Sequence, residues 1–321
     1  MPPAPEWSPG QAAVPQGRVL IGRYRIEKTL GQGGMGEVVL ALDTLLNRRV
    51  ALKRLHPTGE DRKSLRNSIL KEARRAGQIN DRRIASIYDV LDLEDEIVLV
   101  MEYVEGMTLR QRMAEPVPLE TFWEIANECV EGLAAAHAHG VIHRDIKPEN
   151  LMLTGNGQIK ILDFGIARRT ESASPTTTLT SGESTSQRIA GTPQYMAPEA
   201  HLGATIDERT DIFSLGVVFY ELLTTRRPFE GATFAAIVDQ VLNATPPPVT
   251  ETNPAAGFAL SGTVAKMLAK QPAERIATLP EVKEQLARAR LDSAPPGAFV
   301  PAAGLRPRTA TPRAPAARCA A

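Results

Sequence analysis

A short stretch near the middle of the chain concentrates the side chains that could carry out chemistry. It contains the strings HRDIKPEN at 143–150 and DFG at 163–165. Asp145 can accept the proton of a hydroxyl group, and Lys147 can reach a terminal phosphate. Asn150 and Asp163 offer the hard oxygen ligands that magnesium prefers. This set of groups is suited to phosphoryl transfer, which requires a positioned hydroxyl, a bound metal ion and neutralised phosphate oxygens.

A glycine-rich segment, LGQGGMGEVVL, lies near the N-terminus. Gly31, Gly33 and Gly36 follow a G-x-G-x-x-G spacing, which lets the backbone approach a phosphate group closely. In a dinucleotide-binding fold a helix should follow at once, but VVLALD follows here and indicates a strand. Taken alone, the glycines also fit an ordinary turn between two strands.

A lysine ends the otherwise apolar run Val50-Ala51-Leu52-Lys53. By itself such a lysine is most often a surface residue. After a glycine-rich loop, Lys53 is the residue expected to hold the α- and β-phosphates of a nucleotide. A carboxylate should orient it, and Glu72 in the next predicted helix is the candidate. Glu72 alone also fits a solvated helix charge.

The first part of the chain is predicted to form a small sheet with one helix. Short runs rich in β-branched residues predict the strands YRIEKTL, EVVLALD, RVALKRL, IASIYDVL and EIVLVMEYV. Between the third and fourth, DRKSLRNSILKEARRAGQI has the apolar spacing of an amphipathic helix, carried by Leu65, Ile69, Ala73 and Ala76.

The second part of the chain is mainly helical. TFWEIANECVEGLAAAHAHG carries one apolar stripe, formed by Phe122, Ile125, Cys129, Leu133 and Ala136. DIFSLGVVFYELLTT suits a helix buried on most sides. We therefore expect an α+β fold with a β-rich N-lobe (24–102) and a helical C-lobe (103–291), with the ligand between them. The Pro-rich and Ala-rich segments 1–20 and 292–321 are expected to be disordered tails.

Charge and cysteine content exclude several other classes. Lys plus Arg and Asp plus Glu both number 37, so no overall field favours nucleic acid or an acidic membrane. Two cysteines make a disulfide framework or a cysteine metal site unexpected. The sequence shows no signal peptide and no apolar run long enough to span a bilayer, so a cytoplasmic location is expected for this chain.

From Tyr24 to Leu291 the motifs resemble the eukaryotic-like Ser/Thr protein kinases, particularly the bacterial members. The resemblance implies a bilobal protein-kinase fold, ATP and Mg²⁺ as cofactors, and transfer of the γ-phosphoryl group to Ser or Thr hydroxyls of proteins. It assigns catalytic roles to Asp145, Lys147, Lys53 and Glu72, and metal binding to Asn150 and Asp163. Lys147 and Thr192, in GTPQYMAPE, resemble the Ser/Thr rather than the tyrosine kinases.

The same resemblance implies a nucleotide site between the lobes. Met101 corresponds to the gatekeeper, and the backbone of Glu102 and Val104 to the hinge that binds adenine. The full implied set is Leu30, Gly31, Gln32, Gly33, Gly34, Met35, Gly36, Glu37, Val38, Ala51, Lys53, Met101, Glu102, Val104 and Met152. Structural roles are implied for a Glu199–Arg275 ion pair, for Asp211 beneath the catalytic loop, for Gly216 in close packing, and for His143 packed against Phe164.

Arg144 precedes the catalytic aspartate, a pattern that the resemblance links to activation by phosphorylation. We expect an exposed cationic pocket that binds a phosphorylated residue in the hydroxyl-rich segment before Glu199. The candidate sites are Ser184, Thr185 and Ser186, modified by autophosphorylation within a homodimer. The alternative is a flexible loop without a regulatory site. One departure from the family pattern is Asp81-Arg82-Arg83 in place of His-Pro-Asn. We expect it to alter how the helix bearing Glu72 is tethered, and with it the resting orientation of that helix.

Two other functions fit parts of the sequence. A pseudokinase scaffold would bind nucleotide or partners without turnover, but Lys53, Asp145, Asn150 and Asp163 are all present. A small-molecule kinase on the same fold would be expected to lack the GTPQYMAPE segment, which resembles a platform for peptide substrates.

Overall fold

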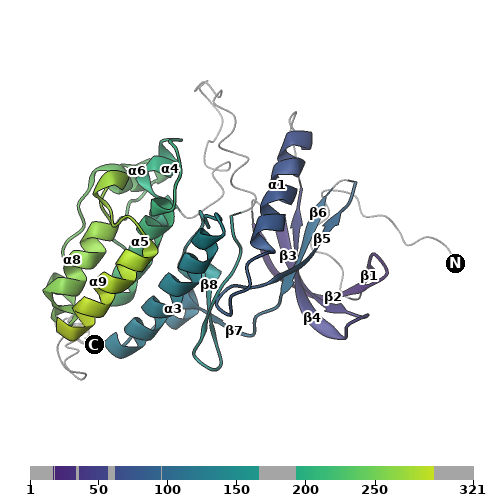
Figure 1. The fold of residues 1–321 in the computed structure, drawn as a ribbon, viewed down its shortest axis with the longest axis horizontal. Coiled ribbons are helices and arrows are strands. Elements are labelled where there is room, and N and C mark those ends of the chain that lie inside the picture. The colour runs from purple at the N-terminus through teal and green to yellow at the C-terminus, as the bar shows by residue number, and fades with distance from the viewer. Residues whose placement is uncertain are drawn as a thin grey trace, which may run out of the picture.

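The computed structural model describes residues 17, 19–33, 36–56, 62–94, 96–165 and 193–292. Their first part is an antiparallel sheet in the order β1-β2-β3-β4-β6-β5, with α1 lying along it (Figure 1). The elements are β1 (Val19–Leu20), β2 (Tyr24–Gly33), β3 (Gly36–Asp43), β4 (Arg48–Leu55), α1 (Arg62–Ala76), β5 (Ile87–Asp92) and β6 (Ile97–Glu102).

The alternation of side chains gives this sheet two different faces. One face carries a small separate core, built from Tyr24, Ile26, Val39, Ala41, Val50, Leu52, Val98 and Val100. The other face turns Leu55 and Leu99 toward α1, where Ile69 and Ala73 are buried. This second face joins the main core of the molecule, which continues into the helical lobe.

The prediction of a disordered tail over residues 1–20 is wrong for Val19 and Leu20. Val19 pairs with Arg25 and Leu20 with Tyr24, so that β1 adds an edge strand to β2. Composition alone favoured disorder here, but two apolar residues next to an unpaired strand edge can satisfy that edge.

The helical lobe begins with a three-stranded sheet formed by β7 (Gly106–Thr108), β8 (Leu151–Thr154) and β9 (Ile159–Ile161). Its α-helices are α2 (Leu109–Arg112), α3 (Leu119–Ala138), α4 (Pro198–His201), α5 (Arg209–Thr224), α6 (Phe234–Asn243), α7 (Val249–Thr252), α8 (Gly257–Met267) and α9 (Leu279–Asp292). The 3₁₀ turns are η1 (Pro148–Asn150), η4 (Pro193–Tyr195), η5 (Pro254–Ala256) and η6 (Pro272–Glu274).

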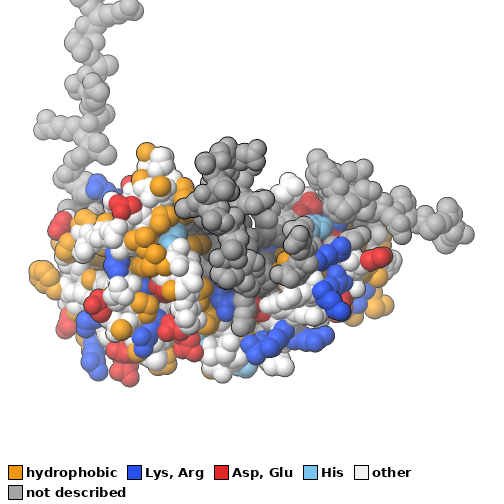
Figure 2. Space-filling model, turned by 90° about the horizontal axis from the view of Figure 1, so that it is seen from above, with side chains coloured by type: hydrophobic (Ala, Val, Ile, Leu, Met, Phe, Trp, Pro, Cys, Tyr) orange, Lys and Arg blue, Asp and Glu red, His pale blue; other side chains and the backbone are white. Residues whose placement is uncertain are grey.

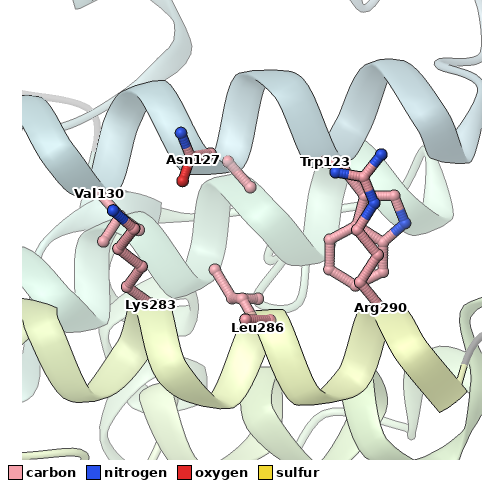
Figure 3. A pocket seen from close by; sticks show the side chains of 8 residues that line it. Trp123, Asn127, Val130, Lys283, Leu286 and Arg290 are labelled. Carbon is pink, nitrogen blue, oxygen red and sulfur yellow. The ribbon is translucent and has the colours of Figure 1, made fainter.

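Helix α5 is the centre of this lobe, and every residue of it after Arg209 is buried. At Gly216 a Cβ atom would lie 2.8 Å from the Cβ of Met267, so the close packing predicted for this glycine is confirmed. The predicted apolar stripe of α3 is also buried. Helices α3 and α9 pack side by side, with a shallow hollow between them that Trp123 and Leu286 line (Figure 3).

The surface shows the same division between the lobes. On the face drawn in Figure 2, hydrophobic side chains gather over the helical lobe at the left, and Lys and Arg side chains gather at the right, over the β-rich lobe. Among the residues that the structure describes, no helix is both long and apolar enough to cross a bilayer.

An ion pair at the end of β3 gives a pH-dependent contribution to stability. Asp43 is buried and receives hydrogen bonds from Arg23, with Nε to Oδ1 at 2.9 Å and NH2 to Oδ2 at 2.8 Å. The backbone N–H groups of Leu45 and Leu46 also donate to Oδ1. The Arg23 hydrogen bonds, against the effect of burial, lower the pKa of Asp43 from 3.8 to about 2.

We expect Arg23→Met to lower the free energy of unfolding at pH 7. Because the pKa of Asp43 is depressed in the folded state, its contribution is complete above about pH 4 and is lost as the pH falls toward 2. The difference between variant and wild type should therefore shrink over that window in urea denaturation. Arg25→Met, at an exposed position of β2, is the control. A difference that stays constant from pH 7 to pH 2.5 would contradict this account.

Candidate active site

The loop that carries Asp145 is fixed by a buried carboxylate of α5. Asp211 accepts hydrogen bonds from the backbone N–H groups of His143 and Arg144 at 2.7 and 2.8 Å, and lies 2.8 Å from Nε2 of His137. Burial opposes ionisation, but the hydrogen bond to His137 and the backbone donors lower the pKa of Asp211. The predicted contact of Asp211 with the backbone of the catalytic loop is confirmed.

Three predicted catalytic and metal-binding side chains meet in the loop itself. Lys147 Nζ donates to Oδ2 of Asp145 at 2.8 Å. Asn150 Nδ2 donates to the same oxygen at 3.0 Å and to the carbonyl of Asp145 at 2.8 Å. The two donors fix the orientation of the Asp145 carboxylate, and the short turn η1 brings Asn150 back to it.

His143 has a packing role in this arrangement. Its ring lies 4.7 Å from that of Phe164, centroid to centroid, as predicted. Nε2 lies 2.8 Å from the carbonyl of Leu162, and Nδ1 accepts from the N–H of Asp145 at 3.2 Å. These partners assign the proton to Nε2. Burial lowers the pKa of His143, which agrees with a neutral ring that does not act as a base.

Asp163 and Asn150 are neighbours across the two strings of the site. The N–H of Leu162 donates to the carbonyl of Asn150 at 2.8 Å, which places the start of DFG beside η1. Asp163 has φ of 60° and Arg144 has φ of 64°. Left-handed backbone is uncommon for residues other than glycine and is found often at functional sites.

The predicted partnership of Lys53 and Glu72 is not the one found. Lys53 Nζ contacts the carboxylate of Asp163, whereas Oε1 of Glu72 lies 3.3 Å from NH1 of Arg144. Arg144, expected as an exposed cation, has a side chain that is only 13% exposed. A buried ammonium group such as Lys53 needs an anion, but either carboxylate can supply it. The choice depends on where α1 sits against the sheet, which motif spacing along the chain does not specify.

One face of the sheet gathers four of the predicted nucleotide-binding residues. Lys53 is the register partner of Val38, and Ala51 is the partner of Met101. Ala51 and Lys53 are two residues apart on β4, so all four side chains leave the sheet on the same side. Leu30 lies on β2 and is 42% exposed, and Met152 lies on β8 beside Thr108.

Glu37 lies on the other face of the sheet. It is the register partner of Arg54, and their side chains are 3.6 Å apart. A contact of Glu37 with a nucleotide would therefore have to come from its backbone. The next residue back, Gly36, has φ of 131°, and a Cβ atom there would lie 1.9 Å from the carbonyl oxygen of Arg54. Only glycine fits this position.

Gly31, Gln32 and Gly33 are the last three residues of β2. Gly34, Met35, Ser184, Thr185, Ser186 and Thr192 all lie outside the described residues.

Glu102, in the predicted hinge, has a side-chain anchor that the sequence did not reveal. The Glu102 carboxylate accepts from Lys160 Nζ at 2.8 Å and from the N–H of Ser86 at 3.2 Å. The Glu102 N–H donates to the carbonyl of Ser86 at 2.8 Å. The backbone N–H of Glu102 is therefore already bonded within the protein, which leaves its carbonyl oxygen for a hydrogen bond to adenine. Lys160 lies in the short strand β9, and no motif marks it.

The departure at Asp81-Arg82-Arg83 forms a charged tether between the lobes. Arg82 lies 2.5 Å from Glu128 of α3, and Arg83 contacts Glu131 of the same helix. The carbonyl of Arg83 accepts from the N–H of Ile161 at 2.6 Å. The segment after α1 is therefore bound to α3 and β9 by charged groups and backbone, where the family pattern has His-Pro-Asn.

The segment that follows the active site is held by a buried ion pair. Arg275 donates from NH1 and NH2 to the two oxygens of Glu199, both at 2.7 Å, and its side chain is fully buried. Its Nε donates to the carbonyl of Ala269 at 2.7 Å, and the guanidinium lies over the ring of Phe213. The predicted Glu199–Arg275 pair is confirmed.

Comparison with known proteins agrees with this geometry. The protein kinase domain family matches residues 24–286. The probable serine/threonine-protein kinase PknB of Corynebacterium glutamicum is 34% identical over 281 residues, covering 84% of this chain and 42% of that protein. The serine/threonine-protein kinase PrkC of Bacillus subtilis is 35% identical over 272 residues, covering 84% and 41%. The chain thus spans less than half the length of these curated relatives.

The fold comparison gives a similar result. The crystal structure of a point mutant of the Mycobacterium tuberculosis PknI kinase domain matches with a TM-score of 0.67 at 24% identity. The match covers 87% of this chain and 100% of that one, and shows the bilobal fold. The chain therefore belongs to the protein kinase family, in the eukaryotic-like group to which the bacterial serine/threonine kinases belong. The predicted family and fold class are confirmed.

Proposed function

We propose that this chain transfers the γ-phosphoryl group of ATP to Ser or Thr hydroxyls of protein substrates. The observation that carries the proposal is the cluster in which Lys147 and Asn150 both donate to one carboxylate oxygen of Asp145. In this proposal Asp145 accepts the hydroxyl proton as the acceptor attacks. Lys147 neutralises charge on the transferred phosphate, and Lys53 orients the other phosphates.

The residues present fit a magnesium ion. Asn150 uses its amide nitrogen for Asp145, which directs its amide oxygen away from that contact. The backbone bond from Leu162 to Asn150 brings the neighbouring residue Asp163, a second oxygen ligand, close in the fold. Mg²⁺ usually takes one or two protein oxygens and keeps water and phosphate as its other ligands. When bound, it would neutralise the developing charge on the phosphate oxygens. Asn150 and Asp163 would hold it, and Lys53 would turn from Asp163 to the phosphates.

The proposal is tested with purified protein, radiolabelled ATP and a Ser/Thr peptide library. We expect incorporation of label that requires Mg²⁺ and is lost on chelation, with phosphoserine or phosphothreonine as the product. Nucleotide binding without incorporation, in protein already phosphorylated by a second kinase, would favour the pseudokinase alternative. Transfer to a small-molecule hydroxyl but to no peptide would favour the alternative of a small-molecule kinase.

Regulation by phosphorylation is a further part of the proposal. A phosphate on Ser184, Thr185 or Ser186 would compete with Glu72 for Arg144, which would release Glu72 for Lys53. We also propose a cytoplasmic kinase domain over 24–291 and autophosphorylation between two copies of the chain. Phosphopeptide mapping of active protein that found phosphate only at Thr176 to Thr180, or none, would contradict this assignment.

A further inference from the structure

A charged network lies where the catalytic loop meets α2, η4 and α5. Arg110 of α2 donates from Nε to Glu149 of η1 at 2.8 Å and from NH1 to Glu221 of α5 at 2.7 Å. The hydroxyl of Tyr195, in η4, contacts both Arg110 and Glu221. One guanidinium group therefore connects four elements of the helical lobe.

The network is adjacent to the proposed acceptor site. Glu149 stands in the chain between Lys147 and Asn150, and both of these donate to Asp145. A peptide with its hydroxyl at Asp145 can reach Glu149 within a few residues, because an extended chain advances roughly 3.3 Å per residue. Side chains that flank the acceptor can therefore reach this network.

Exposure decides which members a substrate can contact. The side chain of Glu149 is 40% exposed and that of Arg110 is 28% exposed, whereas Glu221 is buried, with a side chain only 9% exposed. Burial raises the pKa of Tyr195, so its phenol is neutral and serves as a hydrogen-bonding group. A bound peptide would meet Glu149 and the guanidinium of Arg110.

Among the residues that the structure describes, the network of Arg110, Glu149, Glu221 and Arg227 carries no net charge. Two carboxylates close enough to contact one guanidinium group would, without that group, attract a basic side chain of a substrate. Arg110 already supplies a cation to both, and Arg227 places its Nε 3.5 Å from Glu221. The two arginines neutralise the two glutamates. The acidic site formed by Glu149 and Glu221 is therefore occupied by the protein's own cations.

We propose that Arg110 is a specificity-determining residue that closes this acidic site to substrates. The enzyme then accepts Ser/Thr segments without requiring Arg or Lys beside the acceptor. Removal of Arg110 leaves two carboxylates, Glu149 and Glu221, with one arginine, Arg227, and the enzyme gains a preference for a basic residue at one flanking position. The inference rests on the proposed transfer to protein hydroxyls.

The test compares wild type with Arg110→Met on peptides that have one Ser and a single Arg, or Ala, at each flanking position. Wild type should show kcat/KM values for Arg and Ala peptides within about twofold of each other, as expected when no unpaired carboxylate is offered. Arg110→Met should favour Arg at one position by about tenfold, typical of a newly formed charge pair in a partly buried site. Adding Glu149→Gln should remove the gain.

The matched control is Arg112→Met, on the same short helix. Its guanidinium lies 3.5 Å from the carbonyl of Glu115, outside the network, so its peptide preferences should equal those of wild type. A wild-type enzyme that already selects Arg at a flanking position, and loses that selection in Glu149→Gln, would overturn the proposal. That comparison decides the matter even where Arg110→Met does not fold.

Binding separates this inference from the proposed function. Fluorescence anisotropy with labelled Arg and Ala peptides reports the same preference without turnover. Tighter binding of the Arg peptide by Arg110→Met than by wild type supports the specificity role, whether or not label is transferred. Equal affinities of folded Arg110→Met for the two peptides overturn it. Absence of transfer from ATP to every peptide contradicts the proposed function alone.

Discussion

Replacing Asp145 by Asn should lower the rate of phosphoryl transfer by about 10²–10⁴-fold, the usual contribution of a positioned general base. An amide occupies the same space and can keep an oxygen toward Lys147 and Asn150, but it cannot accept the hydroxyl proton. The fold should be retained. The measurement is the initial rate with Mg-ATP and a Ser peptide, with circular dichroism and thermal unfolding as checks on the fold.

The control is the same chemical change at Asp89, an exposed residue of β5. Asp89→Asn should transfer phosphate at the wild-type rate, which would show that an Asp to Asn change does not itself impair the enzyme. A pure preparation of Asp145→Asn with wild-type activity would remove Asp145 from the proposed mechanism.

The second large effect is expected on stability, from the pair between Arg275 and Glu199. Arg275→Ala leaves the buried Glu199 carboxylate without its bidentate partner, and breaking such a pair costs about 3–5 kcal/mol. The carbonyls of Ala269 and Lys270, which Arg275 also bonds, lose their donor as well. The free energy of unfolding, obtained from urea denaturation, should fall accordingly.

Two comparisons sharpen this measurement. Arg288→Ala removes an exposed i,i+4 partner of Glu284 and should cost at most about 0.5 kcal/mol. The double variant Arg275→Ala with Glu199→Ala should lose less than the sum of the single variants, because no charge is then left buried alone. Equal losses of unfolding free energy in Arg275→Ala and Arg288→Ala would show that the buried pair stabilises the fold no more than an exposed pair does.

Much of the fold could be predicted because local patterns and long-range packing agree. The β-branched runs became β2 to β6, and the apolar stripe of α3 became its buried face. The contacts of Asp211 and Arg275 were also foreseen, since each lies in a motif whose neighbours in space are fixed by the family resemblance.

The remaining contacts depend on geometry that no motif encodes. Lys53 pairs with Asp163 because of the position of α1, which is a rigid-body property of two packed elements. Arg110 and Lys160 lie in segments without any motif, and their partners are distant in the chain. Oppositely charged residues are common in any sequence, so the pairs that form become visible only when the fold brings them together.

The continuity of the main core has a consequence for how the molecule unfolds. Leu55, Ile69 and Leu99 of the β-rich lobe belong to the same hydrophobic cluster as Phe164 and Ile212 of the helical lobe. Surfaces that share one core lose their packing together, so the inner face of the sheet and the helices form one cooperative unit. The separate core around Tyr24 and Leu52 is the part of the sheet whose packing does not depend on the helical lobe.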